Sequence, residues 1–265
     1  MVHITKITTQ KKQTGRFNIY VSDGSSEKYA FSVDEDVLIK YQLKKGMELD
    51  EFTQIDVLYQ DTVRKALSTS IQYLAVRMRS EKEVKDYLRQ KEMEDTVIQE
   101  VVHKLYSLKY LNDEEFALAY VRTQINTTDK GPNVVKLELR DKGIEGSIVE
   151  NVMMEFTYDL QLSKVLQLCQ KAQKKRRNDS LYVFNQKLKQ ALNRKGYSFQ
   201  IIDEAMDEMK ETSPDEDLEL EAINKQGVKA IKKYGEDNQK IKQFLYRKGF
   251  SIDQIEEYIN RLDQE

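Results

Sequence analysis

The sequence is poor in the residues that cross-link chains or break helices. Its 265 residues include one cysteine, two prolines and ten glycines. A single cysteine excludes an internal disulfide framework and fits a reducing compartment. No apolar run approaches the roughly 20 residues that cross a membrane, and the N-terminal segment MVHITKITTQ has no apolar signal core. We therefore expect a soluble, cytoplasmic protein with few long loops and many helices.

Side-chain groupings typical of catalytic and metal sites are also missing. The only histidines, His3 and His103, lie far apart in the chain, and neither glycine-rich phosphate motif, GxxxxGK[ST] or GxGxxG, occurs. Cys169 lies at helical spacing from apolar residues, which predicts a small core residue. We therefore expect no enzyme activity, no cofactor and no metal ion.

What the chain does contain is a repeat. Four related segments end in a lysine followed by a turn, and the separations of these lysines are 142−91 = 51, 195−142 = 53 and 248−195 = 53. The segments are LRQKEMEDTVIQEVV, LRDKGIEGSIVENVM, LNRKGYSFQIIDEAM and LYRKGFSIDQIEEYI. The last three are typical of a helix, a glycine stop and a return helix, and the first is a weaker copy. Glu92 replaces the glycine in the first copy, so we expect that turn to be strained or built differently.

The repeat and the segments around it predict a mainly α protein with a small β-rich N-terminal module. HITKITT, RFNIYVS and KYAFSV alternate like three strands, and DEDVLIKYQLKKG is typical of one short helix. From about Asp50 the apolar period becomes 3.6, and each repeat divides into three helices. We expect tandem three-helix repeats that form an elongated, curved array. The predicted parts are the module 1–60 and repeats 61–108, 109–157, 158–210 and 211–265.

Several residues have the spacing of helix caps, in which a hydroxyl is followed three positions later by an acid or amide. The pairs are Ser80 with Glu83, Ser147 with Glu150, and Ser251 with Gln254. Each pair predicts that a helix begins at the next residue.

Basic and acidic blocks alternate along the chain, although its formal net charge is only −2. Residues 161–210 hold 11 Lys and Arg against 5 Asp and Glu, or +6, whereas 111–160 hold 5 against 10, or −5. Residues 211–265 hold 9 against 13, or −4. An acidic last repeat is typical of a solvated cap, which favours a monomer.

The basic block suggests a surface for phosphates or for an acidic protein groove. The competing interpretation is a solvated helix face. A second pair of arginines near residue 78 is a further candidate, and its competing interpretation is a basic helix end before the Ser80 cap. The candidate nucleic-acid or filament-binding residues are Lys171, Lys174, Lys175, Arg176, Arg177, Lys187, Arg194, Arg77 and Arg79. Fifteen tyrosines could also stack on bases, although Tyr87 and Tyr258 fall in apolar stripes and are interpreted as core.

Three stretches together resemble the RecX family of bacterial recombination regulators. They are RMRSEKEVKDYLRQKE at 77–92, YLNDEEFALAYVRTQI at 110–125 and KGPNVVKLELRDKGI at 130–144. The resemblance covers about residues 60–265, and residues 1–60 look like the N-terminal extension of the longer Gram-positive-type members. This chain has four repeats where shorter members have three.

The resemblance implies a regulator with no catalytic residues that binds the RecA filament on single-stranded DNA. It would mostly inhibit filament growth, ATP hydrolysis and strand exchange, in DNA repair, the SOS response and homologous recombination. Double-stranded DNA is an additional partner that the resemblance leaves open. The alternative is an autonomous DNA-binding repeat protein that regulates transcription through helix-turn-helix-like pairs. The acidic repeats argue against it, because a groove-reading helix should be basic in every unit.

Overall fold

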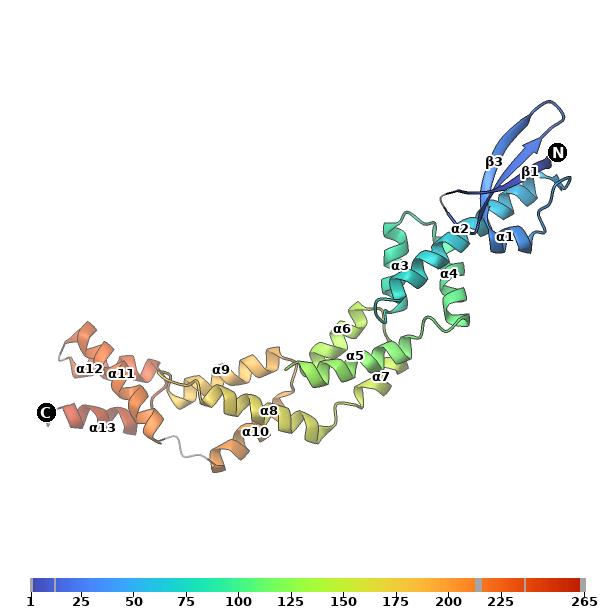
Figure 1. Cartoon of the computed structure of the whole chain (residues 1–265). Helices are drawn as coiled ribbons and strands as arrows, with labels where there is room; N and C mark the ends of the chain where they lie inside the picture. The colour runs from blue at the N-terminus through green and yellow to red at the C-terminus, as the bar shows by residue number, and fades with distance from the viewer. Residues whose placement is uncertain (1, 12, 213–215, 236, 263–265) are drawn as a thin grey trace. The chain divides into compact units, whose positions relative to one another are not determined.

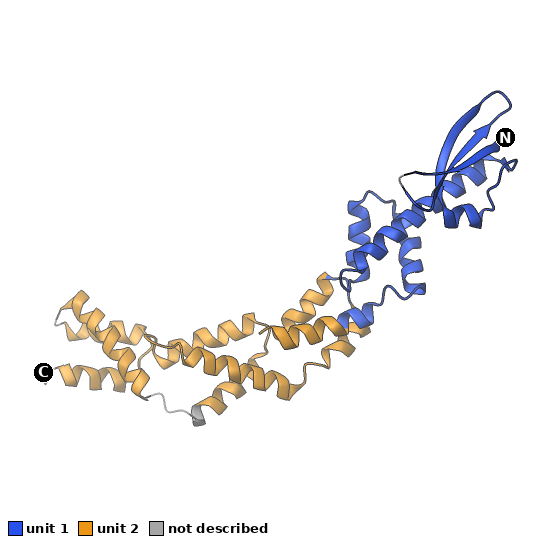
Figure 2. Cartoon of the chain, in the orientation of Figure 1, with its two compact units in different colours: residues 1–117, 142–144 blue, residues 118–141, 145–265 orange. Residues whose placement is uncertain are grey.

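A computed structural model describes residues 2–11, 13–212, 216–235 and 237–262. These residues contain helices α1–α13 and strands β1–β4 (Figure 1). They form two compact units, the first made of residues 1–117 and 142–144 and the second of 118–141 and 145–265 (Figure 2). No helix in the described part of the chain is long and apolar enough to span a membrane.

The N-terminal module is an antiparallel sheet with the strand order β3-β2-β1-β4. The strands are β1 (Val2–Thr9), β2 (Arg16–Ser22), β3 (Glu27–Asp34) and β4 (Glu48–Leu49). Alternation places one side chain in two on an inner face, where Ile19, Val21 and Phe31 pack with helix residues Val37 and Val57. Sequence alternation predicts three of these strands. It misses β4, because two residues are too short to show a period.

The predicted helix of this module is shorter than expected. Helix α1 covers only Glu35–Lys40 and is capped by the Asp34 carboxylate, which accepts from the Asp36 amide. The chain then turns through Gln42 and Gly46, whose φ angles are +50° and +85°. The prediction that the helix runs on to Gly46 is wrong, because the left-handed conformation of Gln42 ends it early.

Helix α2 (Glu51–Leu74) is continuous across residue 60, where the sequence predicts a boundary. Its first half contributes Val57 to the core of the sheet, and its second half contributes Val63, Ala66 and Leu67 to the next core. One helix therefore joins the sheet module to the first set of three helices.

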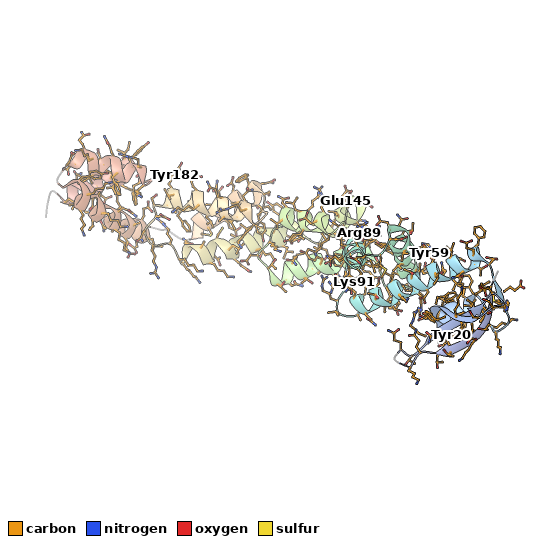
Figure 3. All side chains as sticks on the ribbon, turned by 90° about the horizontal axis from the view of Figure 1, so that it is seen from above. Tyr20, Tyr59, Arg89, Lys91, Glu145 and Tyr182 are labelled. Carbon is orange, nitrogen blue, oxygen red and sulfur yellow. The ribbon has the colours of Figure 1, made fainter. Side chains whose placement is uncertain are left out.

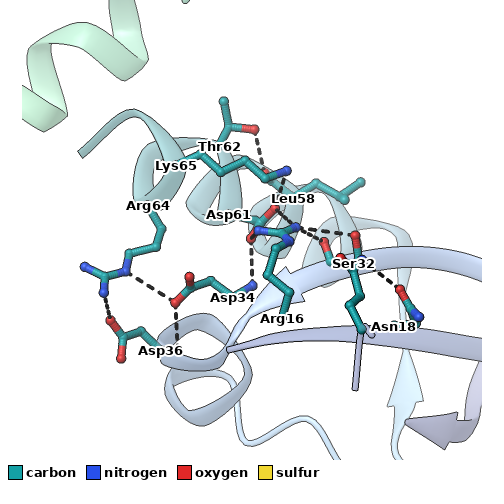
Figure 4. Close-up of polar contacts among 11 residues, drawn as sticks. Arg16, Asn18, Ser32, Asp34, Asp36, Leu58, Asp61, Thr62, Arg64 and Lys65 are labelled. Atoms are coloured by element: carbon teal, nitrogen blue, oxygen red, sulfur yellow. Dashed lines mark hydrogen bonds and ion pairs between the residues drawn. The ribbon is translucent and has the colours of Figure 1, made fainter. Parts of the chain in front are cut away.

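A buried ion pair fixes α2 against the sheet (Figure 4). The Arg16 guanidinium lies 3.0 Å from the Asp61 carboxylate, and Asp61 also accepts the Asp34 amide at 2.8 Å. Lys65 completes the cluster at 2.8 Å from Asp61. Burial raises the pKa of Asp61, but the hydrogen bonds from Arg16 and Lys65 outweigh it and hold the pKa below its usual value.

The first three-helix core combines α2 with α3 (Glu81–Gln90) and α4 (Asp95–Ser107). Helix α3 begins with the predicted capping box, in which the Ser80 hydroxyl accepts from the Glu83 amide and the Glu83 carboxylate accepts from the Ser80 amide. The Tyr73 and Tyr87 rings stack at 3.9 Å beside this core. Tyr87 is thus half-buried and packed, as its apolar position predicts.

The remaining helices follow in sets of three. They are α5 (Asp113–Thr127), α6 (Pro132–Asp141), α7 (Gly146–Met153), α8 (Tyr158–Gln173), α9 (Leu181–Arg194), α10 (Phe199–Thr212), α11 (Glu216–Tyr234), α12 (Asn238–Arg247) and α13 (Ile252–Leu262). The predicted cap between Ser251 and Gln254 is confirmed. The predicted cap at Ser147 is wrong, because α7 already begins at Gly146 and has no side-chain cap. The expectation of tandem three-helix repeats after a β-rich module is confirmed.

Two cores hold the second unit's last six helices. One buries Cys169, Leu188, Ile202 and Met206 between α8, α9 and α10, as their spacing predicts. The other buries Ile223, Leu245, Phe250, Tyr258 and Ile259 between α11, α12 and α13. Helices α11 and α13 approach closely there, since a Cβ on Gly227 would lie 2.1 Å from the Tyr258 ring.

A glycine turn recurs where one three-helix set meets the set before it. Gly143, Gly196 and Gly249 have φ angles of +81°, +98° and +84°. An added Cβ would lie 2.8 Å from Lys82 Cβ at Gly143, 2.6 Å from the Val134 nitrogen at Gly196, and 2.7 Å from Ser180 Oγ at Gly249. Lys82, Val134 and Ser180 lie at the starts of α3, α6 and α9. Each turn therefore packs against the first turn of the preceding set's middle helix.

Hydrogen bonds to the carbonyls of these turns link the same surfaces. The Lys195 carbonyl accepts from the Gly131 amide at 2.6 Å, and the Gly196 carbonyl accepts from the Asn133 amide at 3.1 Å. The Lys248 carbonyl accepts from the Ser180 hydroxyl at 2.7 Å. These bonds pair donors at a helix start with carbonyls at a helix end, so they satisfy carbonyl groups that would otherwise lack a partner and, at Gly196, backbone amides as well.

Glu92 occupies the same turn position in the first set and also adopts a left-handed conformation, with φ of +58°. The strain expected for a non-glycine residue at this position is confirmed. Glu92 is exposed, and the segment before it is the sheet module rather than another three-helix set. At Glu92 the left-handed backbone favours glycine, but the side chain has room, because the start of a preceding helix does not pack against this turn.

We expect Gly196→Ala to lower the free energy of unfolding by about 2 kcal/mol or more, because it combines left-handed strain with a clash against backbone. The matched control is Glu92→Gly, which relieves strain at the equivalent turn and should leave stability unchanged or raise it by up to about 1 kcal/mol. Urea unfolding followed by circular dichroism measures both. A Gly196→Ala variant as stable as the unchanged protein would contradict the close-packing argument.

Candidate interaction surface

The basic run of residues 171–177 lies where α8 ends. Helix α8 stops at Gln173, and the next helix begins after the Ser180 cap, whose hydroxyl accepts from the Val183 amide. Lys171 occupies the last turn of α8, and Lys174 and Lys175 follow it, all exposed. Their charges lie at the negative end of the helix dipole. These three lysines make no ion pair among the described residues, so their ammonium groups face solvent.

Arg176 lies inside the protein instead. Its side chain is 1% exposed and forms an ion pair with Glu219 of α11. Glu219 also accepts the Leu181 amide at 2.8 Å, and Arg176 Nε donates to the Asp179 carbonyl at 3.1 Å. The prediction that Arg176 faces a ligand is therefore corrected: it anchors the α8–α9 loop to α11. Arg177, the next residue, is exposed.

Helix α11 adds further lysines beside this loop. Gln226 donates to the Asn178 carbonyl at 2.8 Å, which places α11 against the loop. A shallow pocket of about 450 Å³ lies between them, and its lining includes Lys225 and Lys229. Lys225 pairs with the Glu221 carboxylate of its own helix, so its charge is partly neutralised. The sequence pattern does not single these lysines out, because they belong to a repeat whose net charge is acidic. Their spacing of four residues on one helix face is the signal that could have found them. We call the whole set the basic junction: Lys171, Lys174, Lys175, Arg177, Lys225 and Lys229.

The two candidates on α9 are not equivalent. Lys187 lies near the loop, but its ammonium is 2.7 Å from the Asp179 carboxylate, so this charge is partly neutralised. Arg194 is exposed at the other end of α9, about 20 Å along a helix of this length. The structure therefore does not bring Arg194 together with the basic junction.

Arg77 and Arg79 belong to the first unit and have internal partners. Arg77 pairs with Glu83 at 2.8 Å. Arg79 donates to the Tyr73 carbonyl at 3.1 Å, and its guanidinium lies 3.7 Å from the Tyr73 ring centroid. Both arginines therefore organise the chain before the Ser80 cap, although they lie beyond the end of α2 at Leu74 rather than in its last turn.

The described residues contain no group of three or more His, Cys, Asp or Glu side chains that could hold a metal ion. Burial raises the pKa of the Cys169 thiol to about 11, so this cysteine is a poor nucleophile. The basic junction exposes ammonium and guanidinium groups, and such groups bind phosphates or carboxylates.

Comparison with known proteins identifies the family. Residues 2–50 match the regulatory protein RecX N-terminal domain, 66–105 the first RecX three-helix domain and 112–153 the second. The third three-helix domain matches residues 159–206 and 216–259. The chain belongs to the RecX family. Helices α8–α10 and α11–α13 of this RecX-family chain thus both fall largely within residues matched by the third domain.

Relatives and solved structures agree with this assignment. The chain is 46% identical over 264 residues to the regulatory protein RecX of Bacillus velezensis, covering 98% of each chain. It is 46% identical over 264 residues to the Bacillus subtilis protein of the same name, again covering 98% of each. A crystal structure of regulatory protein RecX matches 78% of this chain and 100% of its own with a TM-score of 0.69 and 35% identity. RecX from Lactobacillus salivarius matches 57% of this chain and 98% of its own with a TM-score of 0.54 and 38% identity.

We expect Arg176→Ala to lower the free energy of unfolding by about 3–5 kcal/mol, because it leaves the Glu219 carboxylate buried without its partner. The adjacent Arg177→Ala removes the same charge from an exposed position and should change stability by less than about 0.5 kcal/mol. Urea unfolding of the two variants separates the roles of these neighbours. Equal stabilities would mean that the buried pair contributes nothing.

Replacing Lys174 and Lys175 by alanine should flatten the salt dependence of binding to single-stranded DNA. The slope of log K against log salt should fall in magnitude by about 1.4, since each lost phosphate contact on a single strand removes about 0.7. The control is Lys44→Ala with Lys45→Ala, another pair of adjacent exposed lysines, and it should leave the slope unchanged. Fluorescence anisotropy with a labelled oligothymidylate at several salt concentrations measures both.

Proposed function

We propose that this chain binds the RecA filament on single-stranded DNA and mostly inhibits its assembly, ATP hydrolysis and strand exchange. Membership of the RecX family supports the proposal, because the relatives are named regulatory proteins. The observation that carries it in this chain is the basic junction, a cluster of exposed cations held in place by a buried anchor. The compartment would be the cytoplasm, and the processes would be DNA repair, the SOS response and homologous recombination.

The charge pattern suits a partner that is part protein and part nucleic acid. The basic junction matches the phosphates of a DNA strand, whereas the block 111–160, at −5, repels phosphates and fits a basic protein surface. We propose that the module 1–60 and the repeats 61–108, 109–157, 158–210 and 211–265 act as separate parts of this binding surface. The monomer would be the active form.

The repeated joints support a role that depends on a fixed arrangement of neighbouring helices. Gly196 and Gly249 each pack against the start of the preceding middle helix, so adjacent three-helix sets of the second unit are held in register. Side chains on consecutive sets can then meet consecutive features of a repeating partner. A filament of identical protomers is such a partner.

Titration of the purified chain into RecA from the same organism on single-stranded DNA tests the proposal. We expect ATP hydrolysis to fall at well below one regulator per recombinase, because a regulator bound to the filament affects many protomers. DNA binding by the chain alone is measured at the same concentrations, and it must be too weak there to coat the DNA.

The variant Lys174→Ala with Lys175→Ala should require several-fold more protein for half inhibition, whereas Lys44→Ala with Lys45→Ala should behave like the unchanged chain. Unchanged ATP hydrolysis, together with tight and salt-sensitive DNA binding, would overturn the proposal. That outcome would favour the alternative, an autonomous DNA-binding repeat protein that acts as a transcriptional regulator.

A further inference from the structure

The outer face of the N-terminal sheet carries a row of side chains that the proposed function does not use. Helices α1 and α2 pack on the inner face, where Ile19 and Phe31 lie (Figure 1). On the opposite face, register pairs Lys6 of β1 with Tyr20 of β2, and Tyr20 with Tyr29 of β3. Tyr20 is labelled on the sheet in Figure 3. A cation and two aromatic rings therefore lie side by side across three strands.

The geometry of this row leaves aromatic surface open to solvent. The Tyr20 and Tyr29 ring centroids are 5.9 Å apart at an interplanar angle of 77°, and Lys6 Nζ lies 5.6 Å from the Tyr20 centroid. Tyr29 is 54% exposed. The next paired row along the strands contains Asn18 and Ser32, whose side chains accept hydrogen bonds from Gln10 and Arg16, so the ligand-facing row is Lys6, Tyr20 and Tyr29.

The charge around the row favours a polyanion. Residues 2–22 include lysines and an arginine but no aspartate or glutamate, and the first acid in the chain is Asp23. Arg16 is engaged with Asp61, whereas Lys6 and Lys11 are exposed on β1 and in the β1–β2 turn. The first two strands therefore present positive charge beside the tyrosine rings.

We propose that Lys6, Tyr20 and Tyr29 form a stacking platform for bases of single-stranded nucleic acid, with Lys6 and Lys11 facing its phosphates. Exposed aromatic rings on a sheet bind unstacked bases, and nearby cations bind the backbone. Duplex DNA offers no such bases, because its base faces are already stacked on one another. This site needs no recombinase and is separate from the basic junction, so it goes beyond the proposed function.

A tryptophan reporter tests the platform directly. The sequence contains no tryptophan, so Tyr20→Trp makes position 20 the sole indole in the full-length chain. We expect a short oligothymidylate to quench its fluorescence, because a stacked base contacts the ring. An oligonucleotide of the same length with abasic sites keeps the phosphates and should quench little. Tyr110→Trp, at a tyrosine that is 50% exposed elsewhere in the first unit, should not respond to either oligonucleotide.

Affinity measurements provide a second readout. Tyr20→Ser with Tyr29→Ser should weaken oligothymidylate binding about tenfold or more, since stacking contributes substantially for each base. Tyr20→Phe with Tyr29→Phe keeps both rings and should stay within about twofold. Lys174→Ala with Lys175→Ala is included in every variant, so that the basic junction contributes less. Circular dichroism confirms that the serine variant folds.

Three results would overturn the platform. They are equal quenching by thymidylate and abasic oligonucleotides, binding seen by anisotropy without any change at the tryptophan, and an unchanged affinity of a folded serine variant. The test omits recombinase, so loss of the platform and loss of ATPase inhibition are separate outcomes.

Discussion

The close contact between a glycine turn and the start of a preceding middle helix is the constraint on which the helical part depends. At Gly196 two requirements coincide, a left-handed backbone and the absence of a Cβ next to the Val134 nitrogen. Only glycine meets both. The same turn ends one helix and forms the joint to the set before it, so the spacing of these glycines sets the spacing of the three-helix sets. Glu92 shows the reverse case, because a turn with no three-helix set before it tolerates a side chain.

A buried ion pair determines which cations of the basic run are exposed at the surface. Arg176 is drawn inward by Glu219, and this buried pair holds the α8–α9 loop against α11. Its neighbours Lys175 and Arg177 are then directed outward, where Lys225 and Lys229 of α11 lie nearby. Within this basic run, Arg176 therefore holds the loop in place, and its neighbours remain exposed. Because the anchor holds the loop in one position, the exposed cations lose less freedom when they bind a partner.

The features predictable from the sequence are those determined locally. The apolar period of 3.6 and the glycine stops predict the helices, and the capping box at Ser80 predicts where α3 begins. Features that depend on distant segments were not predictable. Arg176 cannot be distinguished from Arg177 without knowing that Glu219 lies opposite, and Lys229 gains its place only because α11 packs on the α8–α9 loop. That α2 runs across residue 60 was not predictable for the same reason, since one helix contributes to two cores.

The two nucleic-acid surfaces proposed for this chain respond differently to salt, and this gives each a distinct use. Contacts of the basic junction with phosphates would weaken steeply as salt rises, because such binding releases counterions from the DNA. Base stacking on Tyr20 and Tyr29 depends much less on ionic strength, since rings and bases carry no net charge. The positive charge of the basic junction would accelerate its encounter with any polyanion. Stacking on the tyrosines would retain only strands whose bases are unpaired and unstacked. A regulator with both surfaces would be attracted to DNA in general and be retained on single strands, where a recombinase filament assembles.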